Sequence, residues 1–279
     1  NGLQGTGNAI SIFVNSDASG TTATKANAQI LNAASLTDLN SKTTGLITVT
    51  TNISSIQGTA AEVAAVYDAY DATAVTGTQI TGLAANLPVT IIDAPSGTPA
   101  VGGVVQAADL VKLVASTDGT TGAITLSGAA SISGSFADIK TIVVTKSSQF
   151  TGENADDVTI TDSITAAQAK EISEYIEDPN GTPVAYGAHV TATISDTAMS
   201  KFDTLTEVDD HVFTINIKDA SVDAVKLATL NTKTKGVITV DSATVTGAIG
   251  GIEDIYDTDK TGLAGLGNEA INVTGNVTV

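Results

Sequence analysis

The chain has no cysteine and no tryptophan, and aromatic residues make up only 4% of its 279 residues. Without cysteine, disulfides, thiolate metal sites and cysteine nucleophiles are excluded together. With so few aromatics, the core of a chain that is 42% hydrophobic must be built from Val, Ile, Leu and Ala. Such side chains suit thin, regular, stacked layers better than one large interior.

Basic residues are also scarce. Twelve Lys and Arg stand against 30 Asp and Glu, so the formal net charge is −18 at pH 7. Repulsion between like charges opposes binding to nucleic acid and to anionic membranes. We therefore expect no nucleic-acid partner, and cations are the natural counterparts of this chain.

Long hydrophobic runs are missing as well. No stretch of about 18 apolar residues occurs, so the sequence predicts no transmembrane segment. The chain starts at Asn1 rather than Met, as expected of a mature product after signal removal or of a piece of a longer protein. Either case fits export better than the cytosol, and we predict a secreted or cell-surface location.

Internal repetition is what the sequence has in place of these features, and it decides the fold prediction. The segments "LNSKTTGLITV" from Leu39 and "LNTKTKGVITV" from Leu230 agree at eight of eleven positions. Weaker copies begin at Gly122 and Gly187. We predict a single repeat array over residues 1–279, with units at 8–85, 86–155, 156–211 and 212–267, and with 268–279 as the opening strand of a further, incomplete unit.

Each unit shows the same order of elements. Alternating apolar residues predict an opening strand, as in "AISIFV" (9–14) and "VFTINI" (212–217). An amphipathic helix follows, as in "TAAQAKEISEYI", where Thr165 and Gln168 form a capping box. The segment "SVDAVKLATL" reads likewise, with a helical face of Ala220, Ala224, Leu227 and Leu230.

A glycine then precedes a second strand, as in "GVITV" (236–240), and a shorter helix closes the unit. Thr59 and Glu62 form a second capping box before such a helix. The apolar pair on its inner face recurs from unit to unit, as Val63 and Val66, Ile139 and Ile142, and Ile252 and Ile255.

This order predicts the fold class. Strand–helix–strand connections are overwhelmingly right-handed and join parallel strands. Stacked units therefore favour an α/β protein, a right-handed solenoid of strand–helix–strand–helix repeats with a parallel sheet. Tandem β-sandwich domains are the alternative, since Thr, Val and Gly are abundant, but the capped amphipathic segments argue against it.

Four phrases carry a resemblance to known proteins: "ITGLAA" (80–85), "TGLAGLGNEAINVTG" (261–275), "LNTKTKGVITVDSATVTG" (230–247) and "GTAAEVAAVY" (58–67). They resemble repeat units of very long secreted or cell-surface proteins of bacteria, especially marine cyanobacteria. The resemblance implies a surface-layer, adhesive or motility-associated repeat protein. Such proteins often carry calcium-binding nonapeptide arrays, whereas this chain has no run of the GGxGxDxUx type.

Catalytic motifs are not evident. The two histidines, His189 and His211, have no His or Cys partner at metal-ligand spacing, and we expect structural or surface roles for both. No G-x-S-x-G elbow occurs. The glycine-rich "GLAGLGNE" leads into a strand, so it offers no helix N-terminus for a phosphate. We therefore predict that the protein is not an enzyme.

Acidic turns are the remaining candidates for chemistry. Ca²⁺ binds six to eight oxygen ligands, which paired carboxylates and backbone carbonyls on a loop supply. The spacing does not match an EF-hand, and a solvated acidic turn is the alternative interpretation. The predicted calcium ligands are Asp257, Asp259, Glu269, Asp68, Asp71, Asp156 and Asp157.

The two ends of the chain carry similar phrases, "GTGNAI" (5–10) and "GLGNEAI" (265–271). An open strand edge promotes pairing with another chain, so we predict a homo-polymer joined head to tail through its terminal strands, in a filament, sheath or surface layer. The alternative is a calcium-stabilised adhesin or binding module that contacts a glycan or another cell surface. The predicted assembly residues are Ile10, Ile12, Val14, Ile271, Val273, Val277 and Val279.

Overall fold

A computed structural model describes most of the chain, and its contacts divide into two units. Unit 1 comprises residues 1–132 and 145–153, and unit 2 comprises 133–144 and 154–279. Each unit is described by itself. The described residues are 12–14, 29–49, 53–70, 79–84, 86–92, 103–117, 121–126, 129–151, 157–177, 189–205, 211–258 and 260–275.

The strands of unit 1 form parallel sheets. One sheet has three strands in the order β1-β3-β5, and a second has five in the order β10-β8-β6-β4-β2. β7 neighbours β9 in a further sheet. The strands are β1 (Ile12–Val14), β2 (Gln29–Asn32), β3 (Ile47–Val49), β4 (Ile53–Gly58), β5 (Ile80–Thr81), β6 (Leu87–Ile91), β7 (Gly103–Gln106), β8 (Thr121–Leu126), β9 (Ala129–Gly134) and β10 (Phe150–Thr151).

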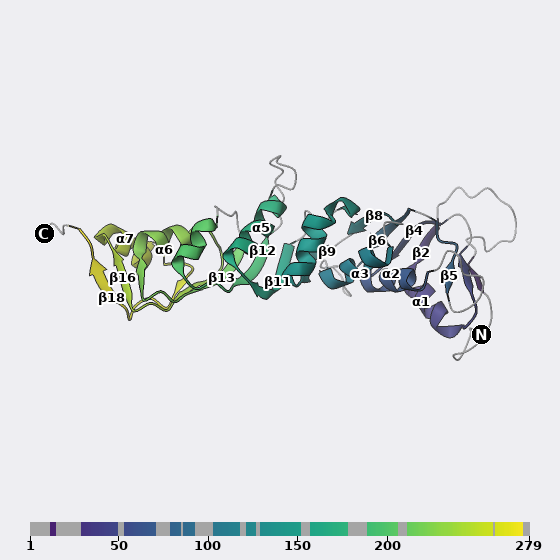
Figure 1. The fold of residues 1–279 in the computed structure, drawn as a ribbon, viewed down its shortest axis with the longest axis horizontal. Helices are drawn as coiled ribbons and strands as arrows, with labels where there is room; N and C mark the ends of the chain where they lie inside the picture. Colours follow the sequence, from purple (N-terminus) through teal and green to yellow (C-terminus); the bar gives the residue numbers. More distant parts are fainter. Residues whose placement is uncertain are drawn as a thin grey trace. The chain divides into compact units, whose positions relative to one another are not determined.

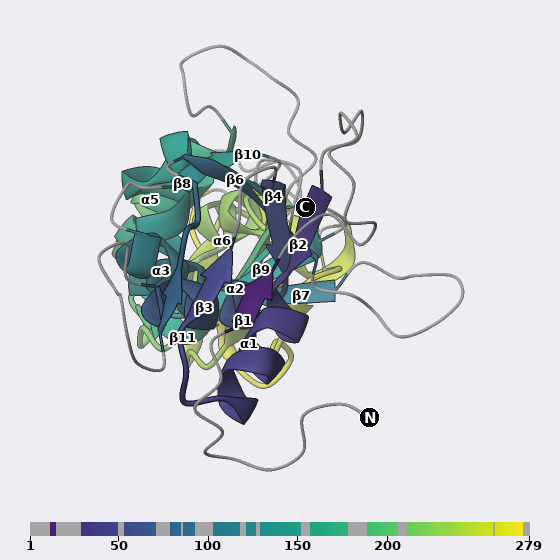
Figure 2. The same cartoon turned by 90° about the vertical axis from the view of Figure 1, so that its right-hand side faces the viewer.

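Helices cover one side of the strands in unit 1. α2 (Ala60–Asp68) packs against both α1 (Ala33–Lys42) and α3 (Ala107–Thr117). The three helices follow one another in Figure 1 and are labelled in the end-on view of Figure 2. η2 (Ser147–Gln149) is a short 3₁₀ turn. The expected capping box begins α2, because the Thr59 hydroxyl accepts from Glu62 N–H and the Glu62 carboxylate accepts from Thr59 N–H. That prediction is confirmed.

The strands of unit 2 also pair in parallel. Its larger ladder runs β11, β12, β13, β15, β17, and its smaller sheet has the order β14-β16-β18. The strands are β11 (Asp157–Ile164), β12 (Val190–Ile194), β13 (Val212–Ile217), β14 (Ser221–Asp223), β15 (Ile238–Val240), β16 (Thr244–Gly247), β17 (Leu263–Ala264) and β18 (Ala270–Val273).

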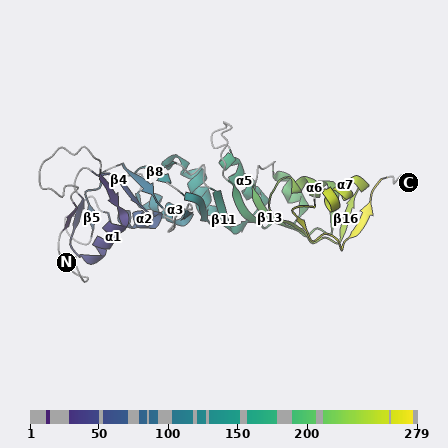
Figure 3. The same ribbon diagram turned by 180° about the vertical axis from the view of Figure 1, so that it is seen from behind.

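Helices line one side of these strands in unit 2, as α5, α6 and α7 do in Figures 1 and 3. Two of the short α-helices continue directly into a π-helical turn, α4 into η1 and α7 into η5. The helices are α4 (Phe136–Lys140), η1 (Thr141–Thr145), α5 (Ala166–Glu177), η4 (Met199–Thr204), α6 (Ala224–Asn231), α7 (Ile249–Glu253) and η5 (Asp254–Thr258).

Strands from successive turns of the chain lie next to each other. Ile215 pairs with Ile238, 23 residues later (238 − 215), and Ile238 pairs with Leu263, 25 residues later (263 − 238). The chain therefore returns to the same sheet after about one strand–strand–helix passage, and we call one such passage a coil. Parallel strands and helices confirm the α/β prediction, and they do not fit the β-sandwich alternative, whose sheets are antiparallel.

The order within a coil differs from the predicted strand–helix–strand–helix order. A second short strand precedes the helix: β14 lies between β13 and α6, and β16 between β15 and α7. Ala220, expected on the helix, instead lies before β14, and α6 begins at Ala224 after the N-cap Asp223. A three-residue strand with one buried side chain, Val222, shows no alternation long enough to be recognised.

The predicted inner pairs of the closing helices are buried. Val63, Val66, Ile139, Ile142 and Ile255 are 0% exposed. Ile252 is 8% exposed. A second capping box, between Thr165 and Gln168, is also formed. The helical period of the sequence therefore identified the core side of these helices correctly.

Carboxylates of one coil cap the helix of the coil before it. Asp162 accepts from Phe136 N–H at 2.7 Å, and Asp196 accepts from Ala166 N–H at 2.8 Å. Asp219 accepts in the same way from Met199 N–H at 2.6 Å. The first N–H groups of a helix have no partner within the helix, and a negative charge there is favourable. Part of the acidic composition thus holds successive coils together.

None of the described helices is both long and apolar enough to cross a membrane, which agrees with the prediction of no transmembrane segment.

Candidate functional site

The predicted calcium ligands lie apart in the described residues. Asp68 ends α2 and Asp257 lies in η5, both exposed, whereas Asp157 accepts from His189 through backbone N–H and Nδ1, each at 2.9 Å. Asp71, Asp156 and Asp259 lie outside the described residues. Within the described ranges, no three Asp, Glu, His or Cys side chains are grouped closely enough to hold a metal ion.

Glu269, also predicted as a ligand, caps its own turn. Its Oε1 and Oε2 accept from Gly267 N–H at 2.9 and 2.8 Å, and Oε2 accepts from Asn268 N–H at 2.9 Å. This arrangement fixes the turn that leads into β18. Calcium binding stays a prediction from the sequence. The described side chains form no ligand cluster that would add to it.

The histidines have the structural roles that were expected. His211 is 1% exposed, and its Nδ1 accepts from Val190 N–H at 3.2 Å in the neighbouring strand. In the next coil, Thr234 plays the same part, since its Oγ1 accepts from Phe213 N–H at 2.8 Å. In both cases a buried polar side chain in the turn that leads into a strand accepts a hydrogen bond from the previous strand.

The predicted assembly residues fall on two strands. Ile12 and Val14 lie in β1, which pairs with β3. Ile271 and Val273 lie in β18, which pairs with β16. β1 is therefore the first strand of its coil, like β13, whereas β18 is a second strand, like β14. Ile10, Val277 and Val279 lie outside the described residues.

The column of core residues that ends in β18 is exposed at its last member. Val222 pairs with Val245, and Val245 pairs with Ile271, so the three side chains occupy equivalent positions in successive coils. Val222 and Val245 are 1% and 0% exposed, but Ile271 is 46% exposed and Val273 is 40% exposed. Helices pack against β14 and β16, whereas the inner face of β18 is exposed among the described residues.

A shallow hollow of about 270 Å³ adjoins this face. Exposed Ile271 forms one wall, and the Tyr256 hydroxyl oxygen is buried without a hydrogen-bond partner among the described residues. Leaving a buried hydroxyl unpaired costs about 1–3 kcal/mol, which an incoming acceptor would offset. The lining residues are Ile252, Glu253, Tyr256, Gly267, Glu269 and Ile271.

A column in the five-stranded sheet of unit 1 is buried to its last described member. Ile56 pairs with Val89, Val89 with Ile124, and Ile124 with Phe150. The first three are 0% exposed, and Phe150 is 4% exposed. The exposed Ile271 and Val273 thus contrast with a column whose last described member, Phe150, is buried.

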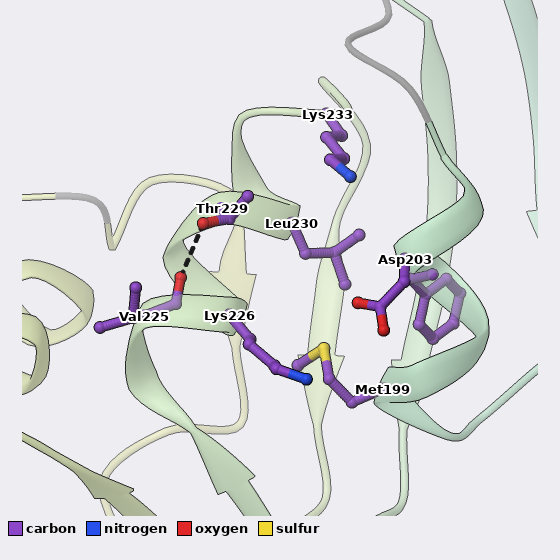
Figure 4. Close-up of a pocket in the computed structure, with 8 residues that line it drawn as sticks. Met199, Asp203, Val225, Lys226, Thr229, Leu230 and Lys233 are labelled. Carbon is purple, nitrogen blue, oxygen red and sulfur yellow. Dashed lines mark hydrogen bonds between the residues drawn. The ribbon is translucent and has the colours of Figure 1, made fainter.

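A second pocket lies between η4 and α6 (Figure 4). Its volume is about 100 Å³, room for about three waters at about 30 Å³ each. Lys226 points toward Met199, while Lys233 donates from Nζ to the Leu205 carbonyl oxygen. Ligand sites for small molecules usually occupy about 300–1,000 Å³. This pocket is therefore too small for a sugar or a nucleotide, and the β18 end is the stronger candidate site.

Comparison with known proteins adds no assignment: no protein-family model, curated protein or solved structure matches the chain.

Proposed function

We propose that the protein is a secreted or cell-surface structural protein without catalytic activity, whose copies join head to tail in a filament, sheath or surface layer. Each unit is proposed to be a set of turns of a right-handed α/β solenoid. The observation that carries the proposal is the uncovered core column at β18, where Ile271 is 46% exposed although its partner Val245 is 0% exposed. The resemblance to cell-surface repeat proteins points to the same role.

β18 offers two kinds of contact to a second copy. No strand among the described residues pairs with its outer edge, so its backbone N–H and C=O groups are available to a parallel strand. Its inner face offers Ile271, and fully burying an Ile side chain stabilises by about 1.5–3 kcal/mol. Backbone pairing sets the register, and the apolar contact supplies affinity.

The proposed partner strand is β2 of the next copy. β2 ends the five-stranded sheet of unit 1, and no described strand pairs with its outer edge. Like β18, it is the second strand of its coil; β2 is followed by α1. Parallel addition of β2 to β18 would continue the ladder of second strands from one copy to the next. Such a contact is heterologous, so its repetition gives an open polymer unless the rotation between copies closes a ring.

The test compares assembly of the wild-type chain with that of I271D/V273D, by sedimentation velocity and negative-stain microscopy. The wild type is expected to form polymers, with a melting temperature that rises with protein concentration. The variant is expected to stay monomeric and folded. The control V104D/V225D adds the same two charges at residues that are 53% and 56% exposed elsewhere, and it should still polymerise.

Two results would overturn the proposal: polymers of I271D/V273D, or a wild type that stays monomeric at every concentration. The adhesin alternative would be supported instead if the melting temperature of dilute monomer rose with added glycan or Ca²⁺ and did not depend on protein concentration.

A further inference from the structure

The outward-facing side of the larger ladder in unit 2 carries no charged side chain on β12, β13, β15 or β17, and on β11 only Asp157 and Asp162 are charged. In β12, β13 and β15 the outward-facing residues alternate with buried ones, and throughout the ladder they are half-buried or exposed. Register places them in columns, for example Thr159–Thr191–Val212 and Ser163–Thr193–Thr214. We define the neutral face by Thr159, Ser163, Thr191, Thr193, Val212, Thr214, Asn216, Val237, Thr239 and Ala264.

The charged residues near this face lie at its margins. Asp157, at the start of β11, is bonded to His189. Asp162, in the bulge of β11, accepts from Phe136 N–H at the start of α4. Lys218 and Asp241 follow the ends of β13 and β15. None of the four interrupts the columns of the neutral face.

Charged side chains gather instead on the helices of the same unit. Lys140 of α4 pairs with Glu171 of α5 at 2.7 Å, and Lys170 pairs with Glu174 at 3.3 Å. Glu253 and Asp254 are exposed on α7 and η5. The side of unit 2 that carries helices is therefore highly charged, whereas the opposite side of its ladder is uncharged apart from Asp157 and Asp162 of β11.

Unit 1 shows the same arrangement on its five-stranded sheet. Gln57, Thr90 and Thr125 form an in-register column of half-buried or exposed side chains. Ser55 and Pro88, two residues earlier on β4 and β6, are also uncharged and face outward. Two separate sheets thus share a neutral outer side in a chain whose net charge is −18.

The distribution of charge determines which surfaces of two copies can approach each other with the least electrostatic repulsion. Copies that each carry −18 repel, and the repulsion is weakest where no charge is brought close. Sheets pack face to face about 10 Å apart, and Thr columns offer both methyl groups for packing and hydroxyls for hydrogen bonds. Neutral columns also avoid the repulsion that stacked like charges would cause within the sheet.

The area of the face limits the strength of one contact. Five strands about 4.8 Å apart and about five residues of about 3.3 Å each span roughly 400 Å². A standard stable interface buries about 800 Å² on each partner. A single pair of faces would therefore bind weakly, whereas copies held side by side in arrays would bind tightly through many simultaneous contacts.

We propose that the neutral face is the lateral contact between copies of this chain, the surface through which joined copies associate side by side into a sheath or layer. The inference rests on the proposed function in one respect: end-to-end joining would form the arrays in which many lateral contacts act together. It names a contact distinct from the β18 end.

The experiment supplies the array artificially, so that it does not depend on end-to-end joining. The full chain is attached through its N-terminus to beads of two colours at high density, and mixed clusters are measured by flow cytometry. T193E/T239E places two carboxylates on the neutral face, two strands apart so that they do not stack. The matched control A167E/T229E adds the same charges on α5 and α6. Circular dichroism checks that each variant is folded.

Wild-type, A167E/T229E and I271D/V273D beads are expected to cluster, and clustering should grow as salt screens the repulsion between copies. T193E/T239E beads should cluster at least tenfold less. Three results would overturn the proposal: clustering of T193E/T239E at the wild-type level, no clustering of wild-type beads, or an equal loss in I271D/V273D. If the wild-type chain forms no polymers in solution while wild-type and I271D/V273D beads still cluster, the proposed end-to-end joining is refuted and the lateral contact stands.

Discussion

The two strongest copies of the repeat, residues 39–68 and 230–257, share their local structure but differ in what covers them. Thr43 and Thr234 are both buried, and each Oγ1 accepts from the N–H two residues later at 2.9 Å. Gly82 and Gly265 both have positive φ, and a Cβ at either would collide with the carbonyl oxygen of the paired strand. Similar sequences thus form similar turns.

The two copies differ in how deeply the coil that follows each of them is buried. After the first, the inward column from Ile56 is buried through Phe150; after the last, it ends on exposed Ile271. Tyr67 is 6% exposed, whereas its counterpart Tyr256 borders the open hollow beside β18. Local sequence therefore fixes the turn, while exposure depends on whether another coil, or another copy, stands next to it.

The largest expected effect is a difference in stability loss between a truncated buried side chain, Ile238, and a truncated exposed one, Ile271. I238A removes a side chain that is 0% exposed, and should lower the free energy of unfolding of unit 2 by about 2–5 kcal/mol. I271A removes the same atoms from a side chain that is 46% exposed, and in dilute monomer should cost less than about 1 kcal/mol. Urea denaturation measures both. Equal losses would show that Ile271 is already covered within the monomer.

The next prediction concerns the buried threonine that the two copies share. T234V leaves the N–H groups of Phe213 and Gly236 without their side-chain acceptor, which should cost about 1–3 kcal/mol. T234S keeps the hydroxyl and should lose much less. The corresponding T43V should behave alike, since Gly45 N–H depends on Thr43. A T234V chain as stable as the wild type in denaturant would contradict a role for this hydroxyl.

Sequence patterns predicted those parts of the fold that depend on near neighbours along the chain. Capping boxes at Thr59 and Thr165, and the buried faces of the closing helices, follow from three- and four-residue spacings. β14 was missed because one buried residue, Val222, shows no period. The Asp162, Asp196 and Asp219 caps were missed because each acts on a helix 20 to 30 residues earlier, which only the stacking of coils brings close.

The candidate site was predicted only in part. The sequence placed Ile271 and Val273 in a strand, as found, but their exposure depends on what packs against that strand, which no local pattern reveals. The neutral face was not recognised, since its Thr columns come from strands of four different coils. Its signal in the sequence is the lack of charge at alternate positions in 190–194 and 212–217.

A smaller effect on stability is expected from exchanging the type of helix N-cap between the two copies. Thr59 caps α2, whereas the corresponding Ala248 before α7 makes no side-chain cap. T59A should cost about 1 kcal/mol, and A248S should stabilise unit 2 by a similar or smaller amount, because it gives a free helix N–H an acceptor. Thermal unfolding followed by circular dichroism measures the two shifts. Movement of both variants in the same direction would contradict the capping argument.

The smallest effect at neutral pH is expected at Tyr67. Burial raises the pKa of the Tyr67 phenol from 10.0 to about 12, with a smaller contribution from Tyr70. The unfolded chain loses this proton near pH 10 and the folded chain only near pH 12. The stabilisation is therefore fully present below pH 10 and is lost as the pH rises toward 12. Y67F lacks the titrating group, so its melting temperature should fall less than that of the wild type between pH 10 and 12. At pH 7 the two should melt alike, or Y67F slightly higher, because the buried hydroxyl has no partner among the described residues. Parallel melting curves of the two chains across the alkaline range would show that this hydroxyl titrates as freely in the folded repeat as in the unfolded chain.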